Sequence, residues 1–240
     1  MTLFAPLHLT ILASILLMAG LLVWSCRLNA RRLRVMKQML GYSLAVNEII
    51  WWTFRYAHEG VHLRNLPLQL CDVAVWLAVA ACFLDSTIVR EAAYFPGLAG
   101  ATMALLTPDL FSPWPTYPAI YFFLSHGGIV VAMAVIVFGG RVTFPAKAVW
   151  RQFGLILAYA ALVGTFDRFS GANHMYLMRK PAGASPLDAM GPWPWYLAGG
   201  AALALILFWL LWLPVRRHSE SGEPVSVRDS RAASADGSER

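Results

Sequence analysis

Residues 118–138 read PAIYFFLSHGGIVVAMAVIVF and contain no Asp, Glu, Lys or Arg. At a rise of about 1.5 Å per residue, a helix of this length spans about 30 Å, which is the thickness of the hydrocarbon core of a bilayer. The stretch therefore predicts a transmembrane helix. Its apolar run is interrupted by two polar side chains, Ser125 and His126.

Other apolar blocks of similar length lie on both sides of this stretch. The chain has 240 residues, of which 58% are hydrophobic and 13% charged, whereas an ordinary soluble domain is about 25% charged. This composition excludes a disordered chain, a disulfide scaffold and a typical cytosolic enzyme. We expect an all-α, polytopic membrane protein in which residues 1–218 form one domain of seven transmembrane helices, at about 3–26, 38–58, 67–84, 91–107, 118–138, 148–166 and 193–213.

The basic residues predict the orientation of these spans, because Lys and Arg are enriched in cytoplasmic loops. With the loop after the first span in the cytoplasm, four of the 19 basic residues fall outside: Arg64, Arg168, Arg179 and Lys180. Arg55 lies within a span, and the other 14 fall on the cytoplasmic side: Arg27, Arg31, Arg32, Arg34, Lys37, Arg90, Arg141, Lys147, Arg151, Arg216, Arg217, Arg228, Arg231 and Arg240. We expect the N-terminus outside, the C-terminus in the cytoplasm, and a disordered cytoplasmic tail over 219–240, where apolar periodicity is absent.

The net charge of +6 fits this topology better than nucleic-acid binding, because most basic residues flank apolar segments. Membrane lipids are the expected partners, with no nucleic acid. For residues 3–26 a cleaved signal peptide is the alternative to a retained anchor. We prefer the anchor, because no basic residue precedes the apolar run and a basic cluster follows it.

Polar residues within apolar spans are costly to bury in a membrane, so they are candidates for function. In the span 38–58, helical spacing places Asn47, Glu48 and Arg55 on one face. One interpretation is that Glu48 and Arg55, two turns apart, form a charged pair that fixes helix packing. The other is that Arg55, near the outer end, contacts an anionic headgroup.

The span 67–84 opens with Pro67, which suits a first helical turn, and places Cys71 about one turn deep from the outer side. The positive end of a helix dipole favours a thiolate, so Cys71 is a candidate nucleophile. Asp72 opposes that effect but could orient a base. The alternative is that Cys71 is a small packing residue.

His126 is predicted about two turns from the outer end of the span 118–138, at a depth comparable to that of Cys71. A histidine can act as a general base and remove the proton of a thiol. The alternative is a histidine that bonds a neighbouring helix. Gly127 and Gly128 allow close approach of a helix or a lipid.

A zinc-site pattern, H-E-x-x-H, occurs at His58-Glu59-Gly60-Val61-His62. Such a site requires a continuous helix and a third ligand, whereas this segment contains a glycine and straddles the predicted end of a span. The alternative is a set of polar residues at the membrane boundary. We therefore expect no metal and no other cofactor.

The loop 167–192 carries further polar candidates for substrate binding: Asn173, His174, Tyr176 and Lys180. It ends in the aromatic segment Gly191-Pro192-Trp193-Pro194-Trp195-Tyr196, which is typical of a membrane interface. With the outer loop 107–118, it forms either a lid over a cavity or a layer among the headgroups.

Four motifs occur together: Leu66-Pro67-Leu68-Gln69-Leu70-Cys71, Ser125-His126-Gly127-Gly128, Asn173-His174-Met175-Tyr176-Leu177 with Lys180-Pro181, and the aromatic segment above. In this order the chain resembles the YwaF-like integral membrane proteins, bacterial relatives of the animal transmembrane protein one-six-four. The resemblance implies the inner (plasma) membrane of a bacterium. The animal relative is an acyltransferase that remodels ether phospholipids and depends on a cysteine and a histidine, which correspond to Cys71 and His126.

The resemblance thus implies an enzyme of lipid metabolism, an acyltransferase or lipid hydrolase, in which Cys71 forms a thioester and His126 transfers the proton. Asn47, Glu48, Arg55, Asp72, Asn173, His174, Tyr176 and Lys180 are the expected substrate-binding residues. A non-enzymatic transporter or sensor with a polar outer pocket is the main alternative, and a zinc hydrolase is another. The acyl donor, the acceptor and the oligomeric state stay open.

Overall fold

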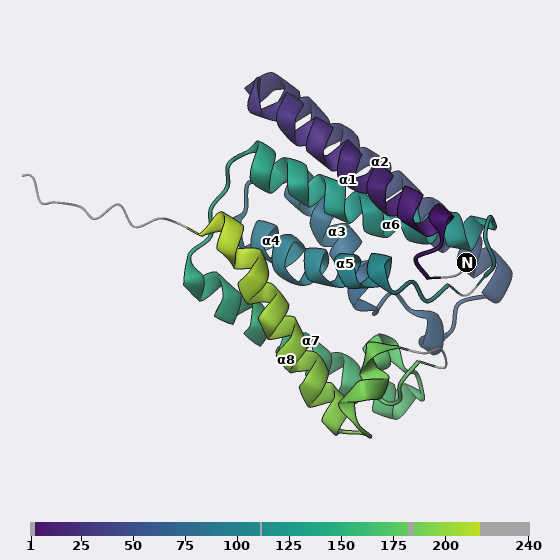
Figure 1. Cartoon of the computed structure of the whole chain (residues 1–240). Coiled ribbons are helices and arrows are strands. Elements are labelled where there is room, and N and C mark those ends of the chain that lie inside the picture. The colour runs from purple at the N-terminus through teal and green to yellow at the C-terminus, as the bar shows by residue number, and fades with distance from the viewer. Residues whose placement is uncertain (1–2, 111, 182–184, 217–240) are drawn as a thin grey trace, which may run out of the picture.

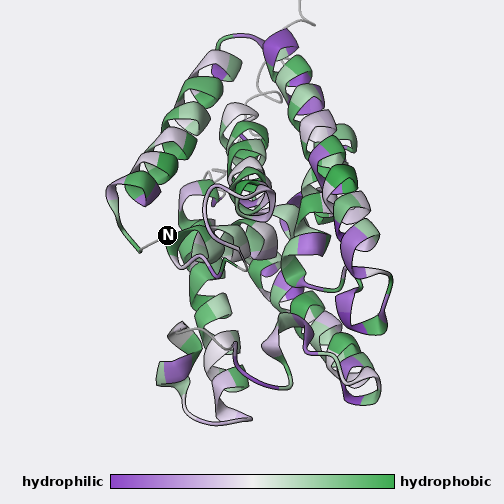
Figure 2. Cartoon of the chain, turned by 90° about the vertical axis from the view of Figure 1, so that its right-hand side faces the viewer, coloured by the Kyte–Doolittle hydropathy of each residue, from purple (hydrophilic) through white to green (hydrophobic). Residues whose placement is uncertain are grey.

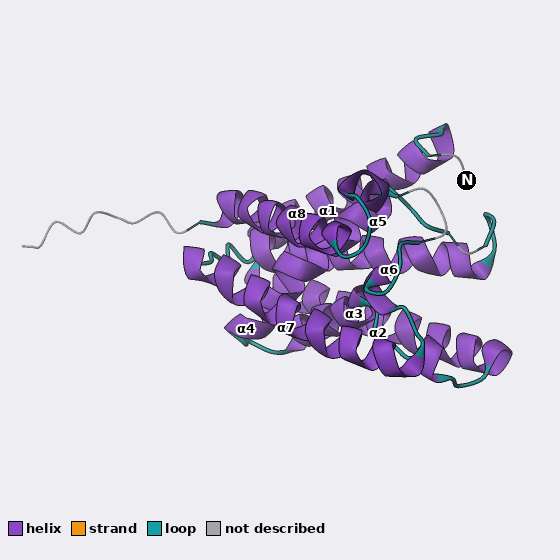
Figure 3. Cartoon of the chain, turned by 90° about the horizontal axis from the view of Figure 1, so that it is seen from below, coloured by secondary structure: helices purple, strands orange, loops and turns teal. Residues whose placement is uncertain are grey.

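The computed structural model of the chain describes residues 3–110, 112–181 and 185–216. Within these ranges every regular element is helical, and the β pairing is limited to one isolated bridge between Phe144 and Arg216. Figure 3 shows the helices packed side by side. The all-α fold is confirmed, whereas the predicted tail, 219–240, lies outside the described residues.

Each predicted apolar stretch corresponds to one helical segment. The α-helices are α1 (Pro6–Arg27), α2 (Ala30–Glu59), α3 (Leu70–Phe83), α4 (Thr87–Ala92), α5 (Leu98–Leu106), α6 (Tyr117–Ala134), α7 (Ala146–Ser170) and α8 (Trp195–Trp212). The π-helical turn η2 (Ala93–Gly97) joins α4 to α5, and η3 (Val135–Gly139) extends α6. The 3₁₀ turns are η1 (Leu63–Asn65), η4 (His174–Tyr176), η5 (Pro186–Met190) and η6 (Leu213–Val215).

Four of the described segments are long and apolar enough to cross a membrane: α1, α6 with η3, α7, and α8 with η6. Large apolar side chains on these helices face outward; Trp24 is 66% exposed and Leu162 is 69% exposed. Helix α3 has 14 residues and is about 21 Å long, shorter than a hydrocarbon core.

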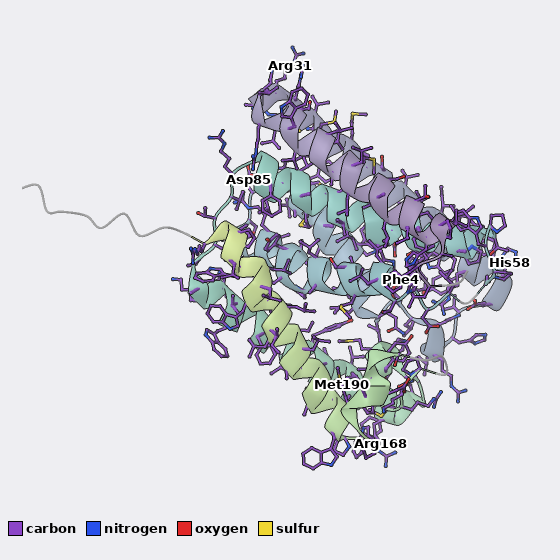
Figure 4. All side chains as sticks on the ribbon, viewed as in Figure 1. Phe4, Arg31, His58, Asp85, Arg168 and Met190 are labelled. Atoms are coloured by element: carbon purple, nitrogen blue, oxygen red, sulfur yellow. The ribbon has the colours of Figure 1, made fainter. Side chains whose placement is uncertain are left out.

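The other helices surround a central segment formed by α3, the turn η2 and α5 (Figure 1). Helices α1 and α2 form an antiparallel pair along one side, α6 packs against both, and α7 and α8 pack together on the other side. Seen from the end that carries the N-terminus, the helices are mostly hydrophobic (Figure 2). Arg31 and Asp85 lie toward the end where the described chain stops, and His58 lies at the opposite end (Figure 4).

Local hydrogen bonds set several helix boundaries that differ from the predicted ones. Asn29 caps α2, because its Oδ1 accepts from the backbone N–H of Arg31 and Arg32 at 2.8 and 3.3 Å, so this helix begins before residue 38. Helix α3 begins at Leu70, where Gln69 and Asp72 form a capping box. The expectation that Pro67 occupies its first turn was wrong, and Cys71 is its second residue rather than one turn deep.

At the end near Asp85, a buried carboxylate of α4 bonds two residues of α7. Glu91 is 0% exposed and forms an ion pair with Arg151 of α7, and Gln152 Nε2 donates to its Oε2 at 3.2 Å. A buried charge is tolerated only where it is paired and hydrogen-bonded. This cluster therefore fixes α7 against α4.

Glycines permit the closest helix contacts. A Cβ atom added at Gly41 of α2 would lie 2.6 Å from the Phe83 ring and 2.8 Å from the Cys82 Cβ atom of α3. A Cβ atom at Gly127 would lie 2.8 Å from Ile15 of α1. Without a bilayer-driven hydrophobic force between helices, such close packing is a main source of association in membranes. The glycines thus admit neighbouring helices.

We expect Gly41→Val to destabilise the fold by about 1–3 kcal/mol, because the added atoms overlap a Cβ atom that cannot rotate away. Thermal unfolding in detergent micelles measures this effect. Gly154→Val on α7 is the matched control, because nothing lies within 4 Å of the position that a Cβ atom would take there. Equal losses in the two variants would show that helix propensity, rather than the α2–α3 approach, limits position 41.

Candidate functional site

Glu48 of α2 is completely buried and joins α2 to α6. Trp52 Nε1 donates to its Oε1 at 2.8 Å, and the Tyr121 hydroxyl donates to its Oε2 at 2.8 Å. The ring of Trp51 stacks on Tyr121, with centroids 4.2 Å apart. Both carboxylate oxygens thus have a partner, which is the condition for burying such a group.

The predicted pairing of Glu48 with Arg55 was wrong. Arg55 Nε instead donates to Glu59 Oε2, one turn further along α2, at 3.0 Å, and its guanidinium lies 5.3 Å from the centre of the Trp52 ring. Two helical turns separate Glu48 from Arg55, and each side chain bonds a nearer partner instead. Asn47, on the same helix, has a buried Nδ2 atom that lacks a partner within the described residues.

Cys71 is a free, half-buried thiol at the start of α3. Asp72 Oδ2 accepts the backbone N–H of Gln69 at 3.1 Å, and the Gln69 side chain completes the capping box. Asp72 therefore stabilises the helix start on which Cys71 lies. In the part of the chain that the structure describes, the thiol of Cys71 bonds no other side chain.

His126 lies in α6 and is 6% exposed. Its Nδ1 is 2.8 Å from the carbonyl oxygen of Phe122, and its ring packs on the Phe122 ring with centroids 4.3 Å apart. A carbonyl only accepts, so Nδ1 carries the proton, and in the neutral ring Nε2 has a free lone pair. Among the described residues, Nε2 has no partner, and no hydrogen bond joins His126 to Cys71.

The loop after α7 is organised by Asn173. Its Oδ1 accepts from the backbone N–H of Met178 and Arg179, both at 3.0 Å, and its Nδ2 donates to the Arg179 carbonyl at 2.9 Å. Lys180 Nζ lies 3.5 Å from the Asp188 carbonyl and 5.5 Å from the centre of the Tyr196 ring. Asn173 thus shapes the loop that carries His174 and Tyr176.

This loop lies against the start of α3. The backbone N–H of Met175 donates to Gln69 Oε1 at 2.7 Å, although Met175 and Gln69 are 106 residues apart. The Tyr176 hydroxyl donates to Asp109 Oδ2 at 3.1 Å, and the Tyr196 hydroxyl donates to the Tyr176 carbonyl at 2.7 Å. Loops 107–118 and 171–180 therefore meet through Tyr176 and Asp109.

The surroundings of Tyr176 raise its pKa. Burial, the nearby Asp109 carboxylate and its hydrogen bond, and the Cys71 sulfur raise the pKa of Tyr176 to about 12. Tyr176 is therefore a neutral hydrogen-bond donor at neutral pH. The structure brings Cys71, Tyr176 and His174 to one region at the start of α3.

Asp167 is a site residue that the sequence analysis missed. It is buried in the last turn of α7, and it contacts His174 with both carboxylate oxygens. The signal was present, since Asp167 is an acidic residue at the end of an apolar span. The sequence analysis places the start of the loop at residue 167, whereas α7 continues to Ser170, so Asp167 lies within the helix.

The H-E-x-x-H segment does not form the geometry of a zinc site. Helix α2 ends at Glu59, and Gly60 has a φ of 74°, so His58 and His62 are not one turn apart on a helix. Glu59 bonds Arg55, and His58 Nδ1 donates to Phe54 O at 2.7 Å. No group of three potential ligands that could hold a metal occurs among the described residues.

A cleft of about 560 Å³ opens beside this segment. Its lining residues are Glu59, His62, Leu63, Arg64, Asn65 and Ser170. Arg64 also approaches Gly171, the left-handed residue at the end of α7. The cleft lies at the end of α7, beside Ser170, and Cys71 and His126 are not among its lining residues.

The comparisons with known proteins give one match. The TMEM164 family model matches residues 3–213, which is most of the chain. No curated protein and no solved structure matches. The matched range includes every helix described here, from α1 to α8, together with Cys71, His126 and the loop that carries His174. The chain is therefore an integral membrane protein of the TMEM164 family.

Proposed function

We propose that this protein is a membrane enzyme that transfers or hydrolyses the acyl groups of lipids through a thioester on Cys71. The observation that carries the proposal is the position of Cys71, a free thiol in the first turn of α3, two residues after Gln69, whose side chain bonds the loop that follows α7. The partial positive charge of a helix N-terminus favours a thiolate, whereas burial and the adjacent Asp72 carboxylate disfavour it, so the thiol needs a general base. The chemistry known for the animal relative of this family supports the same residue.

In this mechanism His126 is the general base. Nδ1 is held by Phe122 O, which leaves Nε2 to take the thiol proton. The sulfur then attacks the acyl ester carbon, the ester C–O bond breaks, and His126 returns the proton to the departing alcohol oxygen. The hydroxyl group of a lysolipid or of water attacks the thioester next and releases the thiol. Because the two side chains share no hydrogen bond in the described structure, the proton transfer requires closer approach or a bridging group.

The remaining candidates divide by how their side chains are used. Asp72 and Asn173 bond the backbone of their own segments, and Glu48 bonds Trp52 and Tyr121. Arg55 and Lys180 are cations, and we propose that they contact the phosphate of the lipid. Asn47, His174 and Tyr176 would contact the polar part of the lipid near the ester.

We also propose that residues 1–218 cross the membrane seven times, with the N-terminus outside and the C-terminal tail in the cytoplasm. The supporting observation is that Arg31 and Asp85 lie at one end of the molecule and His58 at the other (Figure 4). The 14 to 4 division of basic residues assigns the first of these ends to the cytoplasm. The resemblance to YwaF-like proteins supports the inner membrane of a bacterium.

The thioester is directly testable. We expect the purified protein, in vesicles of phosphatidylethanolamine and phosphatidylglycerol with labelled acyl chains, to acquire a hydroxylamine-sensitive label. Cys71→Ala should abolish it, and His126→Gln should slow its formation by about 100-fold or more, because proton transfer is lost. Cys26→Ala is the control and should keep the label. Full lipid turnover in both Cys71→Ala and His126→Gln would exclude the mechanism and favour a transporter or sensor.

The topology has a separate test. Alkaline phosphatase fused after residue 110 or 190 should be active, because both loops are expected outside, and green fluorescent protein fused after residue 216 should fluoresce, because that end is expected inside. Active phosphatase at the C-terminal fusion would contradict the proposed orientation. Equal phosphatase activity at all three positions would contradict the seven-span count.

A further inference from the structure

A buried carboxylate–histidine pair lies at the C-terminal end of α7, and the mechanism above does not use it as such. His174 is 2% exposed and Asp167 is 1% exposed. Asp167 Oδ1 is 2.6 Å from His174 Nδ1, and Asp167 Oδ2 accepts the backbone N–H of His174 at 2.6 Å. One carboxylate thus fixes both the backbone and the ring orientation of this histidine.

The pair leaves a free nitrogen. Since the carboxylate accepts from Nδ1, the neutral ring has its lone pair on Nε2. Nε2 of His174 is buried and has no partner within the described residues. A buried polar atom without a partner destabilises the folded protein, so its presence points to a ligand that would supply a donor.

His8 of the same chain shows what a purely structural buried histidine looks like. It is 0% exposed, yet both of its ring nitrogens have partners. Nδ1 accepts the backbone N–H of Phe4 at 3.0 Å, and Nε2 donates to the Leu105 carbonyl at 2.8 Å. His174, in contrast, lacks the second partner. A packing role therefore explains the hydrogen bond of His174 Nδ1, but it does not explain why Nε2 is buried without a partner.

The histidine is held rigidly beside the start of α3. Its neighbours Met175 and Tyr176 have φ values of 53° and 56°, in the left-handed region that non-glycine residues rarely adopt. Met175 N–H is bound by Gln69, two residues before Cys71, and Tyr176 is bound by Asp109 and Tyr196. Strained backbone of this kind persists where surrounding contacts over-determine it, and it clusters at functional sites.

We propose that Asp167 and His174 form a second acid–base pair, which activates the hydroxyl group that resolves the acyl-Cys71 thioester. This inference rests on the proposed function. The hydroxyl of a lysophospholipid, or of water, donates its hydrogen to Nε2 of His174, which is the donor that this atom lacks. Neither histidine bonds Cys71 in the described structure, so the division of roles is part of the proposal: His126 takes the thiol proton when the thioester forms, and His174 serves the half-reaction in which the thioester is resolved.

The step balances without another reactant. The hydroxyl oxygen attacks the thioester carbon as Nε2 takes its proton, and the C–S bond then breaks with its electron pair on sulfur. The imidazolium gives the proton to the departing sulfur, which regenerates the Cys71 thiol. The products are an acylated lipid when the hydroxyl belongs to a lysophospholipid, and a free fatty acid when it belongs to water. Asp167 is a positioning residue here, because it holds Nδ1–H and stabilises the charged ring.

The experiment separates formation of the thioester from its decay. Full-length protein in the labelled vesicles is pulsed with acyl donor and then chased, with or without lysophosphatidylethanolamine. We expect His174→Gln to form labelled Cys71 at the normal rate and to lose it about 100-fold more slowly, so that the thioester accumulates. Slow decay in either arm supports the proposal, and the affected arm identifies the hydroxyl as that of the lysolipid or of water.

Controls keep the two proposals distinguishable. His58→Gln changes an exposed histidine of the same outer end and should leave both rates unchanged. If His174→Gln fails to fold, Asp167→Asn asks the same question, because an amide can donate to Nδ1 and so place the proton on Nε2. Normal decay in a folded variant, or loss of formation as well as decay, would overturn the inference. Absence of a labelled Cys71 in the unmodified protein would instead overturn the proposed function.

Discussion

A bilayer offers no water to the backbone, and the structure of this chain depends on that constraint. Each peptide group within the hydrocarbon must find its partner inside its own segment, which leaves the helix as the solution for a chain of this kind. The irregular backbone between α2 and α3 and between α7 and α8 lies at the end of the molecule where α2 and α7 stop. The candidate site is built there, at the short helix α3, because only at such a place can loops reach a buried side chain.

The second consequence of the constraint is that buried polar side chains are used in pairs that join different helices. Glu48 binds Tyr121 across α2 and α6, and Glu91 binds Arg151 across α4 and α7. Asp167 joins α7 to the loop of His174. The carboxylates of Glu48 and Glu91 both have hydrogen-bond donors as partners, so these two groups serve helix packing. The third group retains a free ring nitrogen, and this difference separates a structural pair from a candidate acid–base pair.

The proposed enzyme would divide its chemistry between two histidines of different environments. His126 is held by its own helix, one turn away, and lies among helices. His174 is held by a carboxylate and lies in a strained loop that is bound to the start of α3. The first suits a proton exchange with a thiol inside the protein. The second suits a hydroxyl group that enters from the lipid or the aqueous side.

The sequence by itself determined which segments are helical, because apolar runs such as 118–138 are decided by local composition and length. It also identified Cys71 and His126 as candidates and placed the chain near its family. The pairing of Glu48 with Arg55, Pro67 as the start of a helix, and a loop that begins at 167 were wrong, since each rested on spacing along one segment. Only the tertiary structure decided that Tyr121 binds Glu48, that Gln69 binds Met175, and that Asp167 is buried beside His174. The first two contacts join residues 73 and 106 positions apart, and helical periodicity carries no information about which helices are neighbours.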